Sequence, residues 1–492
     1  MDIKSLKDKI LQLAIQGKLV PQDENDEPAS VLLEKIKAEK EQLIKDKVIK
    51  KEKPLPEISE EEKSFNLPKG WEWCRLGQIS NYIKAGGDKP KEFSTVKSRE
   101  YTIPVIANGK TNTGIVGYTK IATENNICIT VSGRGTIGYS CIRKEPFCPI
   151  VRLIVIAPSV CVDISYLNYT LQYFIEQGVG TSIQQLTVPM IKPKVIPLPP
   201  LEEQKRIVTK LDEVFELIDE LDNNKQELLE NISNTRNKVL QLAIQGKLVE
   251  QCEDDEPASV LLERIKAEKE QLVKDKVIKK EKPLPEISEE EKVFDLPKGW
   301  EWCRLGEVGY FQKGFAFKSK DYTDKGIKIT KVSNLNNPNS KDIVYIDSAN
   351  ETLYEQYKLY NDDIVLTTVG SWPTAPASVV GNAIYIDDNF NNTLLNQNAV
   401  RIRTNLNQKY INIVFNSKLF KNYITDIAQG TANQASITQD GIKSFTLPVP
   451  PLEEQKRIAD KVDVIMDYLD KLQQEVESQE IILKDIIQKN NQ

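Results

Sequence analysis

The stretch LQLAIQGKLV at residues 11–20 returns unchanged at residues 240–249, and it opens the repeat that decides the architecture of this chain. The two copies of that repeat, residues 11–77 and 240–306, differ at only seven of 67 aligned positions. DEPASVLLE and LPKGWEWCRLG recur inside it. So long a duplication within one chain indicates a scaffold that is built twice.

A shorter repeat lies at the other border of each copy. PPLEEQKRI occupies residues 199–207 and 450–458, a separation of 251 residues instead of the 229 of the longer repeat. The blocks enclosed by the repeats, roughly residues 78–196 and 307–447, share little obvious identity. A constant frame around two dissimilar blocks indicates one scaffold that presents two different recognition surfaces.

The frame is predicted to be largely helical. After Pro199 and Pro200 a proline-free run extends to Gly246, and Glu202 and Glu203 suit the N-terminus of a helix. Apolar residues recur along this run and along the C-terminal segment at the spacing of a coiled-coil seam. A pair within one chain is favoured over ordinary core helices or a zipper between two copies of the chain. The predicted seam consists of Ile207, Leu211, Val214, Ile218 and Leu221 and of Ile458, Val462, Ile465, Leu469 and Leu472.

Two further parts of the frame are shorter. Asp26 and Pro28 begin a predicted helix through VLLEKIKAEKEQLIKDKVI, and the same start recurs in the second copy. The lysine- and proline-rich segments at residues 50–63 and 279–292 are interpreted as solvated linkers.

The enclosed blocks are predicted to be compact mixed α/β domains, because short β-branched runs alternate with longer helical patterns. The predicted strands are ICITVS (127–132), VRLIVIAP (151–158), DIVLTTVG (363–370) and AVRIRT (399–404), and the predicted helices are YLNYTLQYFIEQG (166–178) and KYINIVFNSKLFKNYI (409–424). The predicted fold class is therefore α/β (α+β), with two globular domains separated by two long antiparallel coiled-coil regions and a circular pseudo-two-fold symmetry.

The predicted domain order follows from the repeats. The predicted segments are residues 1–69 (N-terminal helical part and linker), 70–199 (first globular domain), 200–298 (central helical region and linker), 299–450 (second globular domain) and 451–492 (C-terminal helix).

Composition removes several classes of chemistry. The 492 residues include no histidine, which excludes Ser-His-Asp triads, Cys-His pairs and HExxH zinc sites. The seven cysteines have no CxxC spacing, and we expect reduced thiols in a cytoplasmic protein. No run of 18 apolar residues predicts a membrane span, and the amphipathic start is not a signal peptide.

One motif looks catalytic and is rejected. GRGTIG at residues 133–138 fits GxGxxG, but the strand-like YSCIRKEPF follows it where a dinucleotide site needs a helix. A glycine-rich turn is predicted instead. The sequence has no GxxxxGK[ST] phosphate loop, no amino-methyltransferase motif and no nuclease-like acidic pair with a lysine. The chain is therefore predicted to be non-catalytic and to bind no metal or cofactor itself.

Charge points to recognition. The net charge of −6 hides a balance of +6 over residues 70–200 and +1 over residues 299–450. Lysine and arginine neutralise phosphate, while Arg, Asn and Gln can pair with base edges. Polar loops without a ligand remain the alternative for each single residue. The candidate DNA-binding residues are Lys84, Lys89, Lys91, Lys110, Arg134, Lys144, Gln184, Gln185, Lys313, Lys318, Lys320, Lys331, Asn396, Gln397, Asn398 and Gln434.

The duplicated frame PPLEEQKRI, LAIQGKLV, DEPASVLLE and LPKGWEWCRLG around two dissimilar blocks resembles the specificity subunits of type I restriction–modification systems. The resemblance covers essentially the whole chain. It implies two target-recognition domains that each read one half of a split DNA site, with helices that set the unread spacer. It also implies two methyltransferase subunits docked on the scaffold and two restriction subunits joined through them, in defence against foreign DNA. S-adenosylmethionine, ATP and Mg²⁺ would then belong to those partners.

Two other functions remain open. The chain could serve a modification-only methyltransferase that recruits no restriction subunit. It could also be a coiled-coil adaptor whose blocks bind proteins, although that function explains the duplicated frame poorly.

Overall fold

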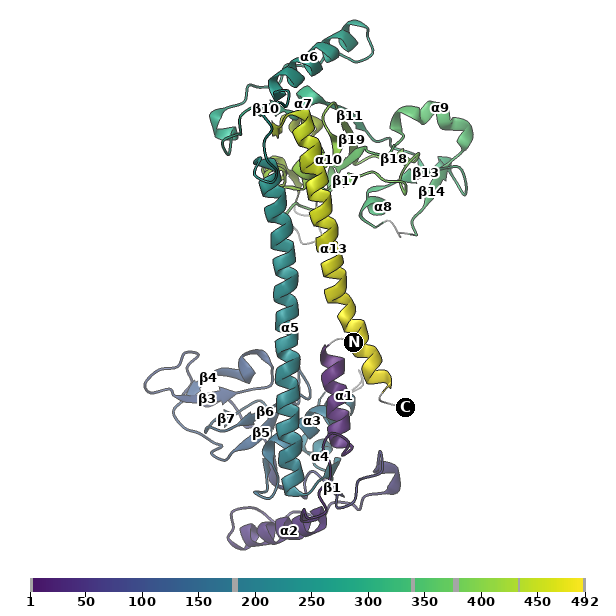
Figure 1. Ribbon diagram of the computed structural model, residues 1–492. Coiled ribbons are helices and arrows are strands. Elements are labelled where there is room, and N and C mark those ends of the chain that lie inside the picture. The colour runs from purple at the N-terminus through teal and green to yellow at the C-terminus, as the bar shows by residue number, and fades with distance from the viewer. Residues whose placement is uncertain (1–2, 179–184, 338–340, 375–379, 432–433, 490–492) are drawn as a thin grey trace. The chain divides into compact units, whose positions relative to one another are not determined.

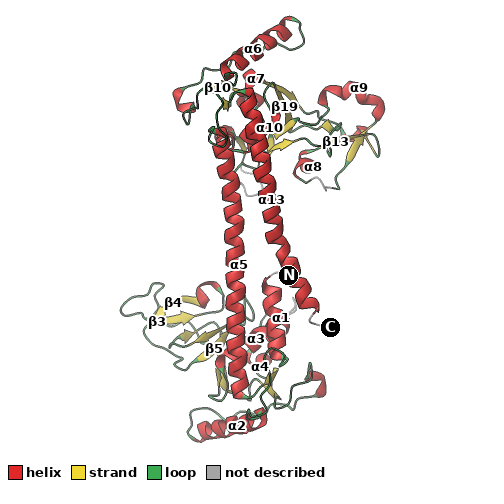
Figure 2. Cartoon of the chain, in the orientation of Figure 1, coloured by secondary structure: helices red, strands yellow, loops and turns green. Residues whose placement is uncertain are grey.

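The computed structural model describes residues 3–178, 185–337, 341–374, 380–431 and 434–489 (Figure 1). The chain divides into two compact units, Met1–Lys225 with Glu480–Gln492 and Gln226–Gln479. Helix α5 (Leu201–Ile244) therefore begins in the first unit and ends in the second. Helices and strands occur together in both units, as Figure 2 shows, and the predicted mixed α/β class is confirmed.

The first unit carries three small sheets with the strand orders β2-β8-β5-β6, β4-β3-β7 and β1-β9. Its helices besides α5 are α1 (Ile3–Ile15), α2 (Ala29–Lys45), α3 (Ile164–Gly178) and α4 (Val188–Ile191). Its strands are β1 (Glu72–Arg75), β2 (Ser80–Ala85), β3 (Ile103–Ile106), β4 (Ile115–Thr119), β5 (Cys128–Val131), β6 (Ser140–Arg143), β7 (Cys148–Pro149), β8 (Ile154–Pro158) and β9 (Val195–Leu198). The core forms where Ile129 and Ile156 of the central sheet pack with Leu167 and Leu171 of α3.

The second unit carries sheets with the orders β11-β19-β15-β17, β12-β14-β13-β18, β16-β21-β20 and β10-β22. Its helices are α6 (Ala258–Lys274), α7 (Leu305–Val308), α8 (Val332–Asn336), α9 (Glu351–Tyr354), α10 (Gln408–Asn416), α11 (Lys418–Ile427), α12 (Gln439–Lys443) and most of α13 (Leu452–Lys489). Its strands are β10 (Glu301–Arg304), β11 (Gly309–Lys313), β12 (Tyr322–Thr323), β13 (Ile327–Thr330), β14 (Val344–Ile346), β15 (Ile364–Thr367), β16 (Val369–Gly370), β17 (Ala383–Tyr385), β18 (Leu394–Leu395), β19 (Ala399–Thr404), β20 (Gln429–Thr431), β21 (Gln434–Ser436) and β22 (Thr446–Val449).

Two sheets of the enclosed blocks share a strand topology although the sequences of the blocks differ. In the central sheet of the first block β8 lies between β2 and β5, and in the second block β19 lies between β11 and β15, all antiparallel. In the smaller sheet β3 pairs antiparallel with β4 and parallel with β7. Strand β13 pairs in the same way with β14 and β18. The dissimilar blocks are therefore two versions of one fold.

Long helices pair within each unit (Figure 1). In the first unit, Leu11 of α1 packs with Ile207 and Leu211 of α5, and in the second, Ile458 and Val462 of α13 join one core with the end of α5. Of the ten predicted seam residues, Ile207, Leu211, Ile218, Ile458, Val462 and Leu469 are buried, and Val214, Ile465 and Leu472 are partly buried.

The prediction is wrong for Leu221, whose side chain is 61% exposed. Lys7 of α1 forms an ion pair with Asp219, with 2.6 Å between Nζ and Oδ1. Because α1 begins at Ile3, one turn before Lys7, the helix that covers this stripe ends near the level of Leu221.

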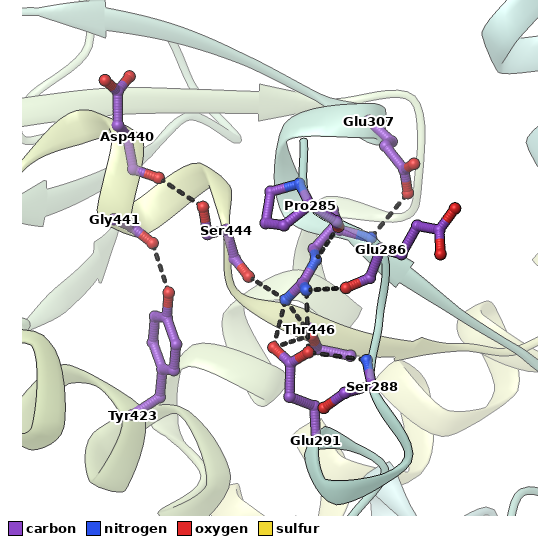
Figure 3. Close-up of polar contacts among 11 residues, drawn as sticks. Pro285, Glu286, Ser288, Glu291, Glu307, Tyr423, Asp440, Gly441, Ser444 and Thr446 are labelled. Carbon is purple, nitrogen blue, oxygen red and sulfur yellow. Dashed lines mark hydrogen bonds and ion pairs between the residues drawn. The ribbon is translucent and has the colours of Figure 1, made fainter. Parts of the chain in front are cut away.

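The segments at residues 50–63 and 279–292, which we call the straps and which were predicted as solvated linkers, are largely exposed, but a buried arginine holds each of them. Arg304 is 3% exposed and donates to the carbonyl oxygens of Pro285 and Glu286 at 3.1 and 2.8 Å. It also forms an ion pair with Glu291 at 2.5 Å (Figure 3). In the same way, Arg75 holds the first strap. It donates to the carbonyl oxygens of Pro56 and Glu57 and to the Glu62 carboxylate. A buried guanidinium needs acceptors for all its N–H groups. For Arg304 the strap supplies two backbone carbonyls and the Glu291 carboxylate, and the Ser444 carbonyl and the Thr446 hydroxyl accept as well.

Candidate nucleic-acid interface

Loops from distant parts of the first block meet at one end of its central sheet. We call residues 86–91, 107–110, 132–138, 149–152 and 185–187 cluster 1. The Asn108 side chain joins two of these loops, since its amide donates to the Val151 carbonyl at 2.8 Å and its oxygen accepts from the Gly133 N–H at 2.8 Å. The Leu186 N–H donates to the Gly133 carbonyl at 2.8 Å. The cluster is thus a hydrogen-bonded surface assembled from five loops.

Cluster 1 displays cationic side chains. Lys89, Lys91, Lys110 and Arg134 are exposed, and Arg134 Nη2 donates to Gln185 Oε1 at 3.0 Å. GRGTIG forms a turn between β5 and β6, as predicted, with φ of +68° at Gly135 and +89° at Gly138. The structure therefore brings five of the predicted residues into one surface.

Two predicted residues of the first block do not join this surface, and a third is not among the described residues. Lys84 forms an ion pair with the buried Glu124 at 2.7 Å. Burial alone would raise the pKa of that carboxyl, but hydrogen bonds from Lys84, Asn126 and Tyr82 outweigh it and lower the pKa. Lys144 follows β6 at the end of the strand away from the glycine-rich turn. Gln184 lies outside the described residues.

The second block builds an equivalent surface, which we call cluster 2, from residues 313–315, 367–372, 395–398, 429–431 and 434–437. The Thr368 N–H donates to the Asn398 carbonyl at 2.8 Å, and the Ile437 N–H donates to the Thr368 carbonyl at 2.9 Å. Cluster 2 differs from cluster 1 in its side chains, since amides outnumber cations. The predicted residues in it are Lys313, Asn396, Gln397, Asn398 and Gln434, of which only Asn396 is partly buried.

The remaining three lysines of the second block lie beside this surface. Lys318 and Lys320 are exposed in the segment between β11 and β12, next to the packed rings of Phe315 and Phe317. Lys331 Nζ lies 2.8 Å from Asp342 Oδ1, so its charge is already paired.

Arg152 and Asn108 of cluster 1 and Trp372 of cluster 2 were not predicted as site residues. The Trp372 indole donates to the Thr431 carbonyl at 2.7 Å. Val151 and Arg152 were predicted to begin a strand, and this is wrong. Their φ values are +53° and +58°, and β8 begins only at Ile154. The β-branched composition of VRLIVIAP gives no local signal of this turn, because long-range hydrogen bonds impose it.

Within the described ranges, no group of three Cys, Asp or Glu side chains could hold a metal ion. No helix in the same ranges is long and apolar enough to cross a membrane.

This chain was compared with known protein families, relatives and solved structures. The family described as type I restriction modification DNA specificity domain matches residues 68–231 and again residues 297–482. The EcoAI specificity subunit of Escherichia coli is 35% identical over 96% of this chain and 90% of that protein. The EcoEI specificity subunit of the same species is 31% identical over 97% of this chain and 91% of that protein. A solved structure concerned with assembly and conformational transition of a type I restriction–modification system matches 86% of this chain and 97% of its own, with a TM-score of 0.51 at 20% identity.

Proposed function

Because this chain belongs to the type I restriction–modification specificity subunits, with two target-recognition domains, we propose that it directs such a complex to a DNA site made of two separated halves. Cluster 1 reads one half and cluster 2 reads the other. One observation carries the proposal: a single fold, set twice in one frame, presents two different sets of cationic and amide side chains. Such side chains can neutralise phosphates and pair with guanine or adenine edges.

The scaffold helices set the unread spacer and dock the methyltransferase subunits. Leu217 of α5 is 57% exposed and Tyr468 of α13 is 67% exposed. Each of these two residues lies ten positions after the last residue of its PPLEEQKRI copy. An apolar side chain exposed at the same place in both copies suits one partner that binds twice. Two methyltransferase subunits dock here, two restriction subunits join through them, and S-adenosylmethionine, ATP and Mg²⁺ are held by those subunits. This chain contributes recognition and no catalysis.

The proposal is tested by sequencing with modified-base detection on DNA from cells that express this chain with its methyltransferase subunit. The expected result is one two-part motif with methylated adenine in each half. Cells that express the methyltransferase subunit alone are the control and should show no such motif. Methylation of one uninterrupted short motif would contradict paired reading. Loss of DNA binding with the methyltransferase present would instead favour a protein adaptor.

A modification-only complex is separated by a second measurement. Purification through a tag on this chain from its own cells recovers a restriction subunit if the complex also cleaves DNA. Recovery of the methyltransferase subunits alone, without ATP-dependent cleavage, would indicate a modification-only complex.

A further inference from the structure

One backbone position has the same unusual conformation in both recognition domains. Arg152 has a φ of +58° and Asn398 a φ of +73°. Each lies two residues before the residue that pairs with the last residue of the strand on one side, since Ile154 of β8 pairs with Ala85 of β2 and Val400 of β19 pairs with Lys313 of β11. The two residues are therefore equivalent, although their sequences do not align.

The hydrogen bonds around the two positions are also equivalent. The Gly86 N–H donates to the Leu153 carbonyl at 2.7 Å, and the Gly314 N–H donates to the Ala399 carbonyl at 3.0 Å. The Val151 and Gln397 N–H groups donate to the carbonyls of Gly87 and Phe315, both at 2.9 Å, and those of Ile150 and Asn396 donate to the carbonyls of Ile106 and Thr330 at 2.9 and 3.0 Å.

In both domains the backbone just before the left-handed residue lies so close to a neighbouring segment that only glycine fits there. The glycines are Gly86 in the first domain and Gly314 in the second. A Cβ on Gly86 would lie 2.7 Å from the Pro149 carbonyl oxygen, and a Cβ on Gly314 would lie 1.9 Å from that of Asn396. The backbone of the loop is thus held from both sides in both domains, whatever side chains it carries.

The side chains on this fixed loop differ completely. The first domain presents Val151 and Arg152, and the second presents Gln397 and Asn398, all four exposed. Left-handed backbone costs a non-glycine residue free energy, and the cost is least for Asn. That cost is retained for an arginine whose guanidinium has no partner among the described residues. A strained, exposed and unpartnered side chain at a loop tip points to a binding role.

We propose that this loop, residues 151–152 and 397–398, is a specificity-determining element of the two domains, which rests on the proposed function. Arg152 pairs with a guanine in one half-site, because its planar donors match the O6 and N7 acceptors. Asn398, supported by Gln397, pairs with an adenine in the other half-site, because an amide matches the N6 donor and N7 acceptor.

The test uses glycine at each position, since glycine removes the side chain and tolerates the positive φ. The variants Arg152→Gly and Asn398→Gly are expressed with the methyltransferase subunit, and their methylation motifs are compared with that of the unchanged chain. Arg152→Gly should reduce discrimination about 10–100-fold at one guanine of one half-site and leave the other half unchanged. Asn398→Gly should do the same at one adenine of the other half-site.

Two outcomes would contradict the proposal, and a further variant provides a check. An unchanged motif and rate in both variants overturns the proposal. A uniform loss of methylation at all sites with an unchanged motif also overturns it, because that is the behaviour of a phosphate contact. Arg152→Lys keeps the charge and loses the bidentate geometry, so it should relax the same guanine position, and recovery of the complex with its methyltransferase shows that the variant is folded. Failure of the proposed function is seen separately, as the absence of a two-part motif with the unchanged chain.

Discussion

At the scale of single residues, a buried tryptophan–glutamate pair joins the two repeated sequences, LPKGWEWCRLG and PPLEEQKRI, in each half of the chain. The Trp71 indole of LPKGWEWCRLG donates to Glu203 Oε2 of PPLEEQKRI at 2.9 Å, and Trp300 donates to Glu454 Oε2 at the same distance. Both carboxylates are 1% exposed. Burial raises the pKa of each carboxyl, and the indole hydrogen bond partly offsets this. The two repeats therefore meet in space and close each block.

Replacing Trp300 by phenylalanine leaves the buried Glu454 carboxylate with one donor fewer. We expect Trp300→Phe to lower the free energy of unfolding by about 1–3 kcal/mol, measured by urea denaturation followed by circular dichroism. Trp302→Phe is the matched control, because the Trp302 ring is half-buried against Phe294 and its indole N–H has no hydrogen-bond partner in the described ranges. Equal losses in the two variants would show that ring packing, and not the carboxylate contact, carries the effect.

At the scale of elements, contacts between residues far apart in the sequence decide where the structure departs from the helices, seams and linkers predicted from local sequence. The stripe on α5 is apolar beyond Ile218, but α1 does not extend to cover Leu221. The straps are polar and proline-rich, yet Arg75 and Arg304 hold them against the recognition domains. The run predicted as one helix at residues 409–424 breaks at Ser417 into α10 and α11.

The α5 stripe gives a direct contrast. Ile207 is 0% exposed and Leu221 is 61% exposed on the same helix. Ile207→Ala should destabilise the chain by about 2–5 kcal/mol, since it leaves a cavity between α5 and α1. Leu221→Ala should change stability by less than about 0.5 kcal/mol. Thermal unfolding of the two variants measures both effects, and a large loss from Leu221→Ala would mean that another surface covers that side chain in solution.

The strap clamp predicts a dependence on pH. The Arg304 hydrogen bonds lower the pKa of Glu291 to about 2. A carboxyl whose pKa is lowered on folding stabilises the folded state above its unfolded pKa, near 4.3, and this contribution is lost as the pH falls through the folded value. The hydrogen-exchange protection of amides in residues 279–292, taken relative to the intrinsic exchange rate at each pH, should therefore persist at about pH 4 and fall as the pH approaches about 2.

Glu291→Gln should release the same strap already at neutral pH. Glu289→Gln is the control, because Glu289 lies on the same strap and its carboxylate, among the residues that the structure describes, forms an ion pair only with Lys292. If exchange is equal in the two variants, the Arg304 clamp does not hold the strap. Glu62→Gln should give the matching result for residues 50–63 and leave the second strap unchanged.

At the scale of the whole molecule, the chain consists of two units built from one repeated plan, and α5 runs without a break through the boundary at Lys225. Helix α13 crosses the second boundary at Gln479. Under the proposed function, in which these helices set the spacer, a change in the number of their residues should change the length of the spacer.

An insertion tests this directly. Seven residues added after Lys225 and seven after Gln479 lengthen each helix by about 10 Å while nearly preserving the helical phase. At about 3.4 Å per base pair this should lengthen the unread spacer of the methylation motif by roughly three base pairs. The same insertion in the strap after Lys51 is the control and should leave the motif unchanged. An unchanged spacer after the helix insertions would contradict the proposal that the helices act as a ruler.

The sequence by itself determined the duplicated frame, the long helices, the mixed α/β blocks and the two-domain organisation, because repeats and helical periodicity are properties of neighbouring residues. Only the tertiary structure decided that the dissimilar blocks share one topology, since strand pairing depends on hydrogen bonds between residues far apart. It also decided the site. Asn108, Val151 and Gly133 meet through hydrogen bonds across more than one strand, and Arg152 leaves the strand its composition predicts because those bonds force a left-handed turn.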